Sequence, residues 1–276
     1  VLDAPHFKDE AAAFVYVEAG LWPAGPVCPF CGEKKRIGRL AGKTTRPGLC
    51  KCYACRKPFT VRQGTIFESS HLPLHLWLQV IHLMCASKKG VSTRQIQRML
   101  SCSMKTAWFL THRIREAMAP TKDASPIGGE GKVVEADETV LTNSPKTRKR
   151  PGYQHKVAVL SLVERGGEQR SVVLESAPAR PEIRRAISKH VHPASILHTD
   201  GAQCYKNALF GGKHESVNHA AGEYARPGKH GAVVHVNSLE GFFSVFKRGM
   251  IGIYQHVEEQ HLQRYVAEFD FRQNTR

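Results

Sequence analysis

Two aspartates and one polar helix face are the residues of this sequence best suited to metal-dependent chemistry. Asp137 and Asp200 stand in or just after short apolar runs, and Asn237, Glu240 and Lys247 follow one another at helical spacings. Mg2+ and Mn2+ prefer oxygen ligands, usually one or two carboxylates together with water and substrate phosphate. Two such ions can activate an attacking oxygen and stabilise a leaving one. The pattern therefore predicts metal-dependent phosphoryl chemistry, with Lys247 placed to contact a phosphate.

The third metal ligand is either Asn237 or Glu240, because both lie on one face of the same expected helix, three residues apart. An asparagine oxygen can bind the metal but brings no charge, so it would leave the metal ions less neutralised. Glu135 shares a strand face with Asp137 and is a further candidate ligand. Glu138 points to the opposite face and is expected to be solvated.

These residues need an α/β framework to bring them together. Four apolar runs have the length and composition of strands. They cover residues 132–139, 156–164, 171–175 and 195–200. A helix is predicted over 181–190, and a last long helix begins near Asn237 and buries a phenylalanine-rich stripe. The order of these elements predicts a mixed sheet, with Asp137 inside its first strand and Asp200 at the end of a later one, where sites of α/β sheets assemble.

A zinc ribbon is predicted near the N-terminus. Cys28-Pro-Phe-Cys31 and Cys52-Tyr-Ala-Cys55 are two Cys-x-x-Cys pairs separated by 20 residues. Each two-residue gap lets one tight turn present two thiolates, and Zn2+ takes four of them in a tetrahedron. Cys50 could replace Cys52, but the knuckle spacing favours Cys52. Four cysteine ligands indicate a structural Zn2+ ion, not a catalytic one.

A helix-turn-helix is predicted over 69–120. One helix begins at Pro73, a short helix is capped by Ser92 with Gln95 three residues on, and a longer helix runs over 103–118. A short helix, a tight turn and a longer helix form the arrangement that places a helix in the major groove of DNA. Four polar residues of the longer helix are expected to contact DNA: Lys105, Thr106, His112 and Arg113. A basic run is expected to contact phosphates through Lys146, Arg148, Lys149 and Arg150.

Composition favours a nucleic-acid partner. The 276 residues include 40 Lys and Arg against 24 Asp and Glu, a formal net charge of +16 spread along the whole sequence. Such an excess favours a long polyanion over a small acidic ligand. The most apolar stretch, residues 72–86, is too short and too polar to cross a bilayer. Clustered cysteines without an export signal favour a metal site in a reducing, intracellular compartment.

Composition also divides the chain into modules. Residues 119–129 are rich in Pro, Gly and Ser, which is typical of a boundary. The expected modules are the N-terminal helix and zinc ribbon over 1–68, the helix-turn-helix over 69–120, a linker over 121–131 and the α/β domain over 132–276.

The ordered set of motifs resembles a known family. A zinc ribbon, a helix-turn-helix and three short motifs occur in sequence. The motifs are Ala136-Asp-Glu-Thr139, His198-Thr-Asp-Gly201 and His235-Val-Asn-Ser-Leu-Glu240, the last followed by Phe246-Lys-Arg-Gly249. This set resembles the DDE-type transposases of bacterial insertion sequences related to the Merlin elements, from about Phe7 to Arg276.

The resemblance implies an RNase H-like catalytic domain that uses Mg2+ or Mn2+. It implies cutting at transposon ends and transfer of the freed 3′-hydroxyl into target DNA. Asp137 and Asp200 become the acidic ligands, Asn237 fits the subgroup that has Asn where others have Glu, and Lys247 fits the basic partner. Arg248 joins the expected DNA contacts. The alternatives are an RNase H-like nuclease without strand transfer and a non-catalytic, domesticated DNA-binding regulator.

The resemblance also implies where and with what the protein acts. The N-terminal modules would bind the terminal inverted repeats, and a homodimer is expected on double-stranded DNA because two ends must be cut and joined. The expected location is the cytoplasm of a bacterium, at the nucleoid. The family pattern continues past Arg276, which suggests a truncated C-terminus.

Overall fold

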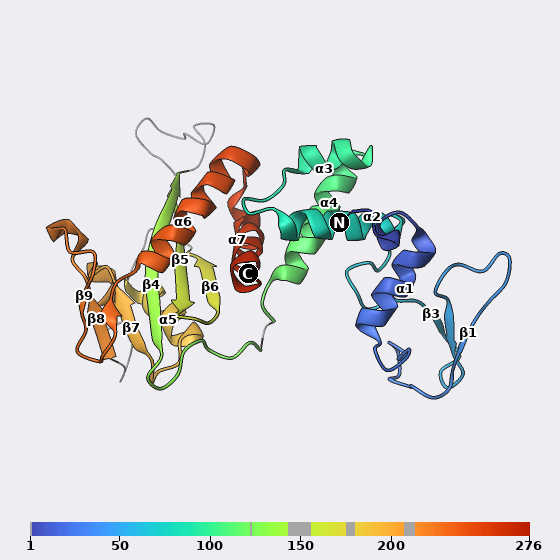
Figure 1. The fold of residues 1–276 in the computed structure, drawn as a ribbon, viewed down its shortest axis with the longest axis horizontal. Coiled ribbons are helices and arrows are strands. Elements are labelled where there is room, and N and C mark those ends of the chain that lie inside the picture. Colours follow the sequence, from blue (N-terminus) through green and yellow to red (C-terminus); the bar gives the residue numbers. More distant parts are fainter. Residues whose placement is uncertain (1, 122, 143–155, 175–179, 207–212) are drawn as a thin grey trace. The chain divides into compact units, whose positions relative to one another are not determined.

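The computed structural model describes residues 2–121, 123–142, 156–174, 180–206 and 213–276 (Figure 1). Contacts divide the chain into two compact units. One comprises Val1–Ser87 with Val91–Ala117, and the other Lys88–Gly90 with Met118–Arg276. No helix among the described residues has both the length and the apolar composition that a membrane crossing requires.

The N-terminal unit begins with a helix and a small sheet. Their bounds are η1 (Pro5–Phe7), α1 (Glu10–Leu21), β1 (Ile37–Arg39), β2 (Cys50–Cys52) and β3 (Pro58–Phe59). The three strands are antiparallel in the order β1-β2-β3. The buried interior of this sheet is small and consists of three cysteines and Phe59, with Trp22 and Ile37 packed against it. So small a core leaves the fold of the ribbon dependent on a further source of stability.

Three helices complete this unit at the places predicted: α2 (Leu74–Ala86), α3 (Thr93–Leu100) and α4 (Met104–Met118). Pro73 stands just before α2 and has no capping side chain. Glu10 of α1 replaces the cap, because its Oε2 accepts the backbone N–H groups of Leu74 at 2.6 Å and His75 at 3.2 Å. Ser92 caps α3 as predicted, since its Oγ accepts the N–H of Gln95 at 3.2 Å. The role of these helices in DNA binding stays a prediction.

The C-terminal unit is built on a five-stranded mixed sheet. Its strands are β4 (Val133–Thr142), β5 (Lys156–Glu164), β6 (Gln169–Val173), β7 (Ile196–Thr199) and β8 (Lys213–Ser216). Their spatial order is β6-β5-β4-β7-β8. The pairs β4–β5 and β5–β6 are antiparallel, whereas β4–β7 and β7–β8 are parallel. Numbered along the chain, the five strands lie in the order 3-2-1-4-5. This order is that of an RNase H-like sheet, as the sequence predicted.

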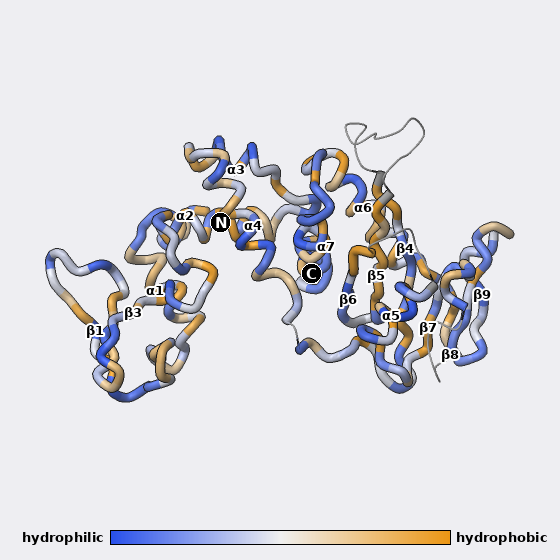
Figure 2. Tube along the Cα trace, turned by 180° about the vertical axis from the view of Figure 1, so that it is seen from behind, coloured by the Kyte–Doolittle hydropathy of each residue, from blue (hydrophilic) through white to orange (hydrophobic). Residues whose placement is uncertain are grey.

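Helices cover both faces of this sheet. Helix α5 (Arg180–His190) packs on one face through Ile183, Ala186 and Ile187. Helices α6 (Asn237–Gly249) and α7 (Glu259–Asn274) pack on the other, α6 mostly through phenylalanines. Strand β5, between β6 and β4, is buried on both faces and is largely hydrophobic in colour in Figure 2. Side chains alternate along β4, so Val134 and Ala136 face α5 while Glu135 and Asp137 face α6.

Helix α7 was not predicted, and it closes the free edge of the sheet. Its polar side chains hydrogen-bond to the unpaired backbone of β6. Asn274 pairs with both the N–H and the C=O of Gln169, at 2.8 and 2.9 Å. Asp270 accepts the N–H of Ser171 at 2.6 Å. Gln263 accepts the N–H of Val173 at 2.9 Å and donates to the C=O of Ser171 at 3.0 Å. The edge is thereby protected from pairing with another strand.

The segment between Asp200 and α6 contains short elements. Its described residues form η3 (Gln203–Tyr205), β8, η4 (His219–Ala221) and a hairpin of β9 (Arg226–Pro227) with β10 (Val233–Val234). After α6 a π-helical turn, η5 (Met250–Tyr254), leads toward α7.

Candidate functional site

The structure places Asp137 and Asp200 side by side, and helix α6, which carries Glu240, packs against the strand of Asp137. Strand β7 runs parallel to β4 with His198 opposite Glu135, so Asp200, just past the end of β7, comes beside Asp137. Burial and the charge of Asp200 raise the pKa of Asp137 to about 7, with smaller contributions from Glu138 and Glu240. Charges that influence one another in this way lie close together in a partly dehydrated site.

Helix α6 is attached to β4 by the buried carboxylate of Glu135. The helix has no capping side chain of its own at Val236. Glu135 supplies the cap, because its Oε2 accepts the backbone N–H of Ser238 at 3.2 Å and its Oε1 accepts the Ser238 hydroxyl at 3.1 Å. Its side chain is completely buried. Glu135 therefore holds the helix, and its contacts do not support the alternative that it binds a metal ion.

Arg165 neutralises Glu135 and joins three more segments to it. Its Nε lies 2.7 Å from Glu135 Oε1. Its remaining nitrogens donate to the carbonyl oxygens of Val233 at 2.7 Å and His235 at 3.1 Å, and reach His198 Nδ1 at 3.3 Å. Burial and the neighbouring Arg165 lower the pKa of His198 to about 4, so its imidazole is neutral and accepts this hydrogen bond. Sequence patterns gave no signal for Arg165, which lies in a turn after β5.

Glu138 is not solvated, contrary to the prediction from strand alternation. It is half-buried on the α5 face of β4 and accepts a hydrogen bond from the buried Tyr205 hydroxyl. Burial raises the pKa of Glu138, and the charge of Asp200 adds to this effect. Tyr205 belongs to η3, five residues after Asp200, so the bond ties the turn that carries Asp200 to the strand that carries Asp137.

The polar residues of α6 differ in their exposure and in their hydrogen-bond partners. Asn237 is exposed, and its backbone N–H donates to His235 Nδ1 at 3.3 Å. Glu240 Oε1 lies 3.6 Å from the Nδ1 of His219 in η4. Lys247 is exposed, seven residues after Glu240 and on the same side of the helix. Arg248 donates from its Nε and a terminal nitrogen to Ser244 on its own helix, at 2.9 and 3.0 Å.

The carboxylate group fits a divalent cation. Burial raises the pKa of Asp137 and the charge of Asp200 adds to this effect, and a bound Mg2+ or Mn2+ ion would favour the charged carboxylate again. Among the described residues the carboxylates are not gathered as tightly as the four ribbon cysteines. Mg2+ commonly retains water and takes substrate phosphate, so two or three protein oxygens suffice. Asp137, Asp200 and Glu240 would hold it.

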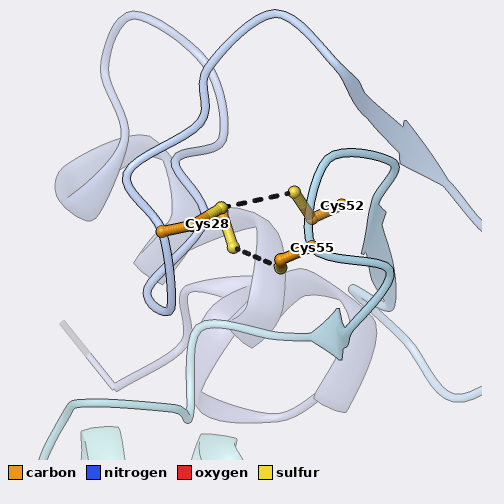
Figure 3. A group of neighbouring side chains, drawn as sticks. Cys28, Cys52 and Cys55 are labelled. Atoms are coloured by element: carbon orange, nitrogen blue, oxygen red, sulfur yellow. Dashed lines mark hydrogen bonds between the residues drawn. The ribbon is translucent and has the colours of Figure 1, made fainter.

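The four predicted zinc ligands converge at one point of the N-terminal unit. The Sγ atoms of Cys28 and Cys55 lie 3.7 Å apart, as do those of Cys31 and Cys52, and all four lie within 4.8 Å of one another (Figure 3). Zn–S bonds of about 2.3 Å in a tetrahedron require sulfur–sulfur distances of about 3.8 Å. The cysteines thus stand where a structural Zn2+ ion needs them.

Cys50 is a core residue of the ribbon. It is completely buried in β2 and pairs with Phe59 of β3. Burial raises the pKa of the Cys50 thiol, which disfavours the thiolate that zinc requires. By contrast, the backbone N–H of Cys55 lowers the pKa of Cys52 to about 7. The preference for Cys52 from knuckle spacing agrees with both observations.

The residues predicted to contact DNA have different surroundings. Lys105 is exposed at the start of α4, and Thr106 is half-buried beside Ser103. His112 is buried with its ring 4.1 Å from that of Trp108, so its prediction as a DNA contact was wrong. Arg113 donates to the Glu68 carbonyl at 2.7 Å and lies over the Phe109 ring. Four further predicted contacts lie outside the described residues: Lys146, Arg148, Lys149 and Arg150.

Comparison with protein families accounts for most of the chain. Residues 128–274 match the ISXO2-like transposase domain, and residues 8–58 match the transposase zinc-ribbon domain. The chain belongs to the ISXO2-like transposase family. The predicted DDE-type transposase with an N-terminal zinc ribbon is thereby confirmed. The relation to Merlin elements and the boundaries of the three modules stay predictions.

One relative and one solved structure complete the comparison. The transposase is 26% identical over 265 residues to an uncharacterized protein in transposable element ISH50 of Halobacterium salinarum, covering 91% of this chain and 86% of the relative. A cryo-EM structure of a simian T-cell lymphotropic virus intasome in complex with PP2A regulatory subunit B56 gamma aligns with a TM-score of 0.31 and 11% identity. It covers 64% of this chain and 63% of that chain. A likeness this low carries no argument about fold or function.

Exchange of single cysteines should distinguish ligands from core residues. We expect Cys52→Ala to lose the zinc and unfold the ribbon, because three thiolates leave the tetrahedron incomplete. Cys50→Ala should keep one zinc ion per chain and show a lower melting temperature from the cavity it leaves. Zinc content of the purified proteins measures the difference. Zinc retained by Cys52→Ala and lost by Cys50→Ala would reverse the assignment.

Asp137 should make the metal-free transposase less stable as pH rises. Its folded pKa of about 7 exceeds the reference value of 3.8, so its contribution is present below about pH 4 and is lost as pH rises through 7. Asp137→Asn carries no charge. Between pH 4 and pH 8, the free energy of unfolding of Asp137→Asn should therefore rise relative to that of the wild type by on the order of 2–4 kcal/mol.

Urea unfolding in chelator at several pH values measures this gain, with Glu259→Gln on the surface of α7 as the control. A difference between Asp137→Asn and wild type that does not change with pH would contradict the packing of carboxylates around Asp137.

Proposed function

We propose that this transposase cuts DNA at transposon ends and joins the freed 3′-hydroxyl to target DNA, with Asp137, Asp200 and Glu240 as its metal ligands. The observation that carries the proposal is the parallel pairing of β4 with β7, which brings Asp200 beside Asp137. Burial raises the pKa of Asp137 to about 7, and the charge of Asp200 adds to this effect. A carboxylate perturbed in this way by its neighbours is typical of a functional site. Membership of the transposase family supplies the class of reaction.

The chain's residues have separate tasks in this reaction. Bound Mg2+ or Mn2+ would activate the attacking oxygen and stabilise the leaving one. Asp137 of β4 and Asp200, just past the end of β7, would hold the cation together with Glu240 of α6. Lys247, about two turns further along α6, is placed to bind a phosphate oxygen as a point charge. Glu135 and Tyr205 keep these elements in position without touching the reacting atoms.

Glu240 is favoured over Asn237 as the third ligand. It lies one turn along α6 from Asn237, and its charge makes a small contribution to the raised pKa of Asp137. A carboxylate also offsets the positive charge of the metal, which an amide cannot do. Asn237, at the first position of the helix, then lies next to the site and can orient water or a phosphate through its amide.

The remaining parts of the proposal concern DNA. A net charge of +16 suits a long polyanion, and the zinc ribbon with helices α3 and α4 would bind the terminal inverted repeats. Lys105 and Thr106 are the proposed contacts on α4, and Arg248 on α6. Because two ends must be cut and joined together, we propose a homodimer on DNA with two-fold symmetry. Its place of action would be the cytoplasm, at the nucleoid.

A plasmid that carries the element's terminal inverted repeats tests the proposal. With Mg2+ or Mn2+, wild type should nick the ends and join them to target DNA, whereas Asp137→Asn and Asp200→Asn should bind DNA without nicking it. Glu240→Gln should nick about 100-fold more slowly or worse. Asn237→Ala should lose only about tenfold, as for a residue that supports a ligand.

The outcomes separate the candidate functions. Nicking without joining would identify a nuclease, and binding without nicking would identify a regulator. Normal nicking by Glu240→Gln with none by Asn237→Ala would transfer the third position to Asn237.

A further inference from the structure

An exposed tyrosine, Tyr224, contacts His219, and His219 in turn lies beside the proposed metal ligand Glu240. The ring of Tyr224 contacts the ring of His219, with centroids 5.3 Å apart and planes inclined by 38°. The Nδ1 of His219 in turn lies 3.6 Å from Glu240 Oε1. Tyr224 is 59% exposed. It is the exposed aromatic residue of the C-terminal unit, since the other aromatic side chains described there are buried or half-buried.

The turn that carries Tyr224 is closed by its own hydrogen bonds. Asn218 Oδ1 accepts the N–H of Ala221 at 3.3 Å, and Glu223 Oε2 accepts the N–H of Asn218 at 3.1 Å. The carbonyl of Asn218 also accepts the N–H of Glu223 at 3.0 Å. Gly222 takes a left-handed conformation with φ of 76°, which a side chain would disfavour. The ring of Tyr224 is therefore presented from a structured turn.

The hairpin that follows is pinned to the sheet on both of its strands. The buried Glu215 of β8 pairs with Arg226 at 3.2 Å, and its two oxygens accept the N–H of Lys229 at 3.1 and 3.0 Å. On the other strand, Arg165 binds the carbonyl of Val233 at 2.7 Å. The hairpin is thus tied to β8 through Glu215 and, through Arg165, to Glu135 of β4. A group bound by Tyr224 would be placed at a set distance from Glu240.

We propose that Tyr224 stacks on an unpaired or terminal base of the DNA strand that enters the active site. This proposal rests on the proposed function, because it assigns DNA to the site beside Glu240. An exposed aromatic ring offers every base a stacking surface, and only an unpaired or terminal base has a free face to use it. Stacking would hold the base while His219, between Tyr224 and Glu240, links its position to the carboxylates. Tyr224 is therefore a residue that positions the strand to be cut.

Fluorescence of 2-aminopurine tests the stacking directly. The probe is a forked duplex with 2-aminopurine as the first unpaired base, mixed with the full chain in Ca2+ to suppress cutting. Wild type should quench the fluorescence, Tyr224→Phe should keep the quenching, and Tyr224→Ala should lose it. Tyr224→Ala should also bind the fork about tenfold more weakly, with little change for a fully paired duplex.

Tyr16 provides a matched control. It is also an exposed tyrosine, 55% exposed, and its ring stacks on His6 at 4.0 Å in the N-terminal unit. Tyr16→Ala should quench the probe like wild type. Equal loss in Tyr16→Ala and Tyr224→Ala would overturn the proposal, and so would full quenching by Tyr224→Ala. A changed oligomeric state in Tyr224→Ala with quenching intact would assign the ring to a protein contact instead.

Failure of this proposal is distinguishable from failure of the proposed function. Metal-dependent nicking that depends on Asp137, together with quenching that does not depend on Tyr224, would remove only the stacking. Quenching that depends on Tyr224, in a protein whose nicking does not depend on Asp137, would remove only the assigned chemistry.

Discussion

The ion pair between the buried Glu135 and the half-buried Arg165 is the interaction on which the catalytic unit depends. A buried carboxylate is costly unless all of its hydrogen-bonding capacity is used. Glu135 meets this condition with Arg165 and with the backbone and hydroxyl of Ser238. Arg165 extends the network to β10 and His235. Glu135 thus determines where α6 begins. It thereby also determines the position of Glu240 relative to Asp137 and Asp200.

This attachment explains how the chain keeps repelling charges together. Burial raises the pKa of Asp137 to about 7, and the charges of Asp200, Glu138 and Glu240 add to this effect. Without an anchor, α6 could relax away from the strands and relieve the repulsion. Glu135 opposes this movement by holding the start of α6, while the Tyr205–Glu138 bond holds the turn that carries Asp200 on the other face of β4. The N-terminal unit uses the same device, since Glu10 of α1 caps α2 and ties the two helices together.

Local patterns predicted much of this structure. The zinc ligands follow from two short spacings, and Asp137 and Asp200 follow from their places in apolar runs. Features that depend on tertiary burial were missed. Helix α7 has a polar sequence because Gln263, Asp270 and Asn274 serve the edge of β6. Glu138 and His112 were assigned to solvent and to DNA from periodicity alone, and both are covered by neighbours that lie far away in the sequence or on another turn of the helix.

Hydrogen exchange at the start of α6 tests the central claim most directly. The Ser238 amide has Glu135 as its acceptor, so replacing Glu135 with Gln removes the charge that holds it. If Glu135 anchors the helix, Ser238 should exchange at least about tenfold faster in Glu135→Gln than in wild type. Amides of α5, on the opposite face of the sheet, should keep their rates. Unchanged exchange at Ser238, or equal acceleration in α5 and α6, would contradict the account.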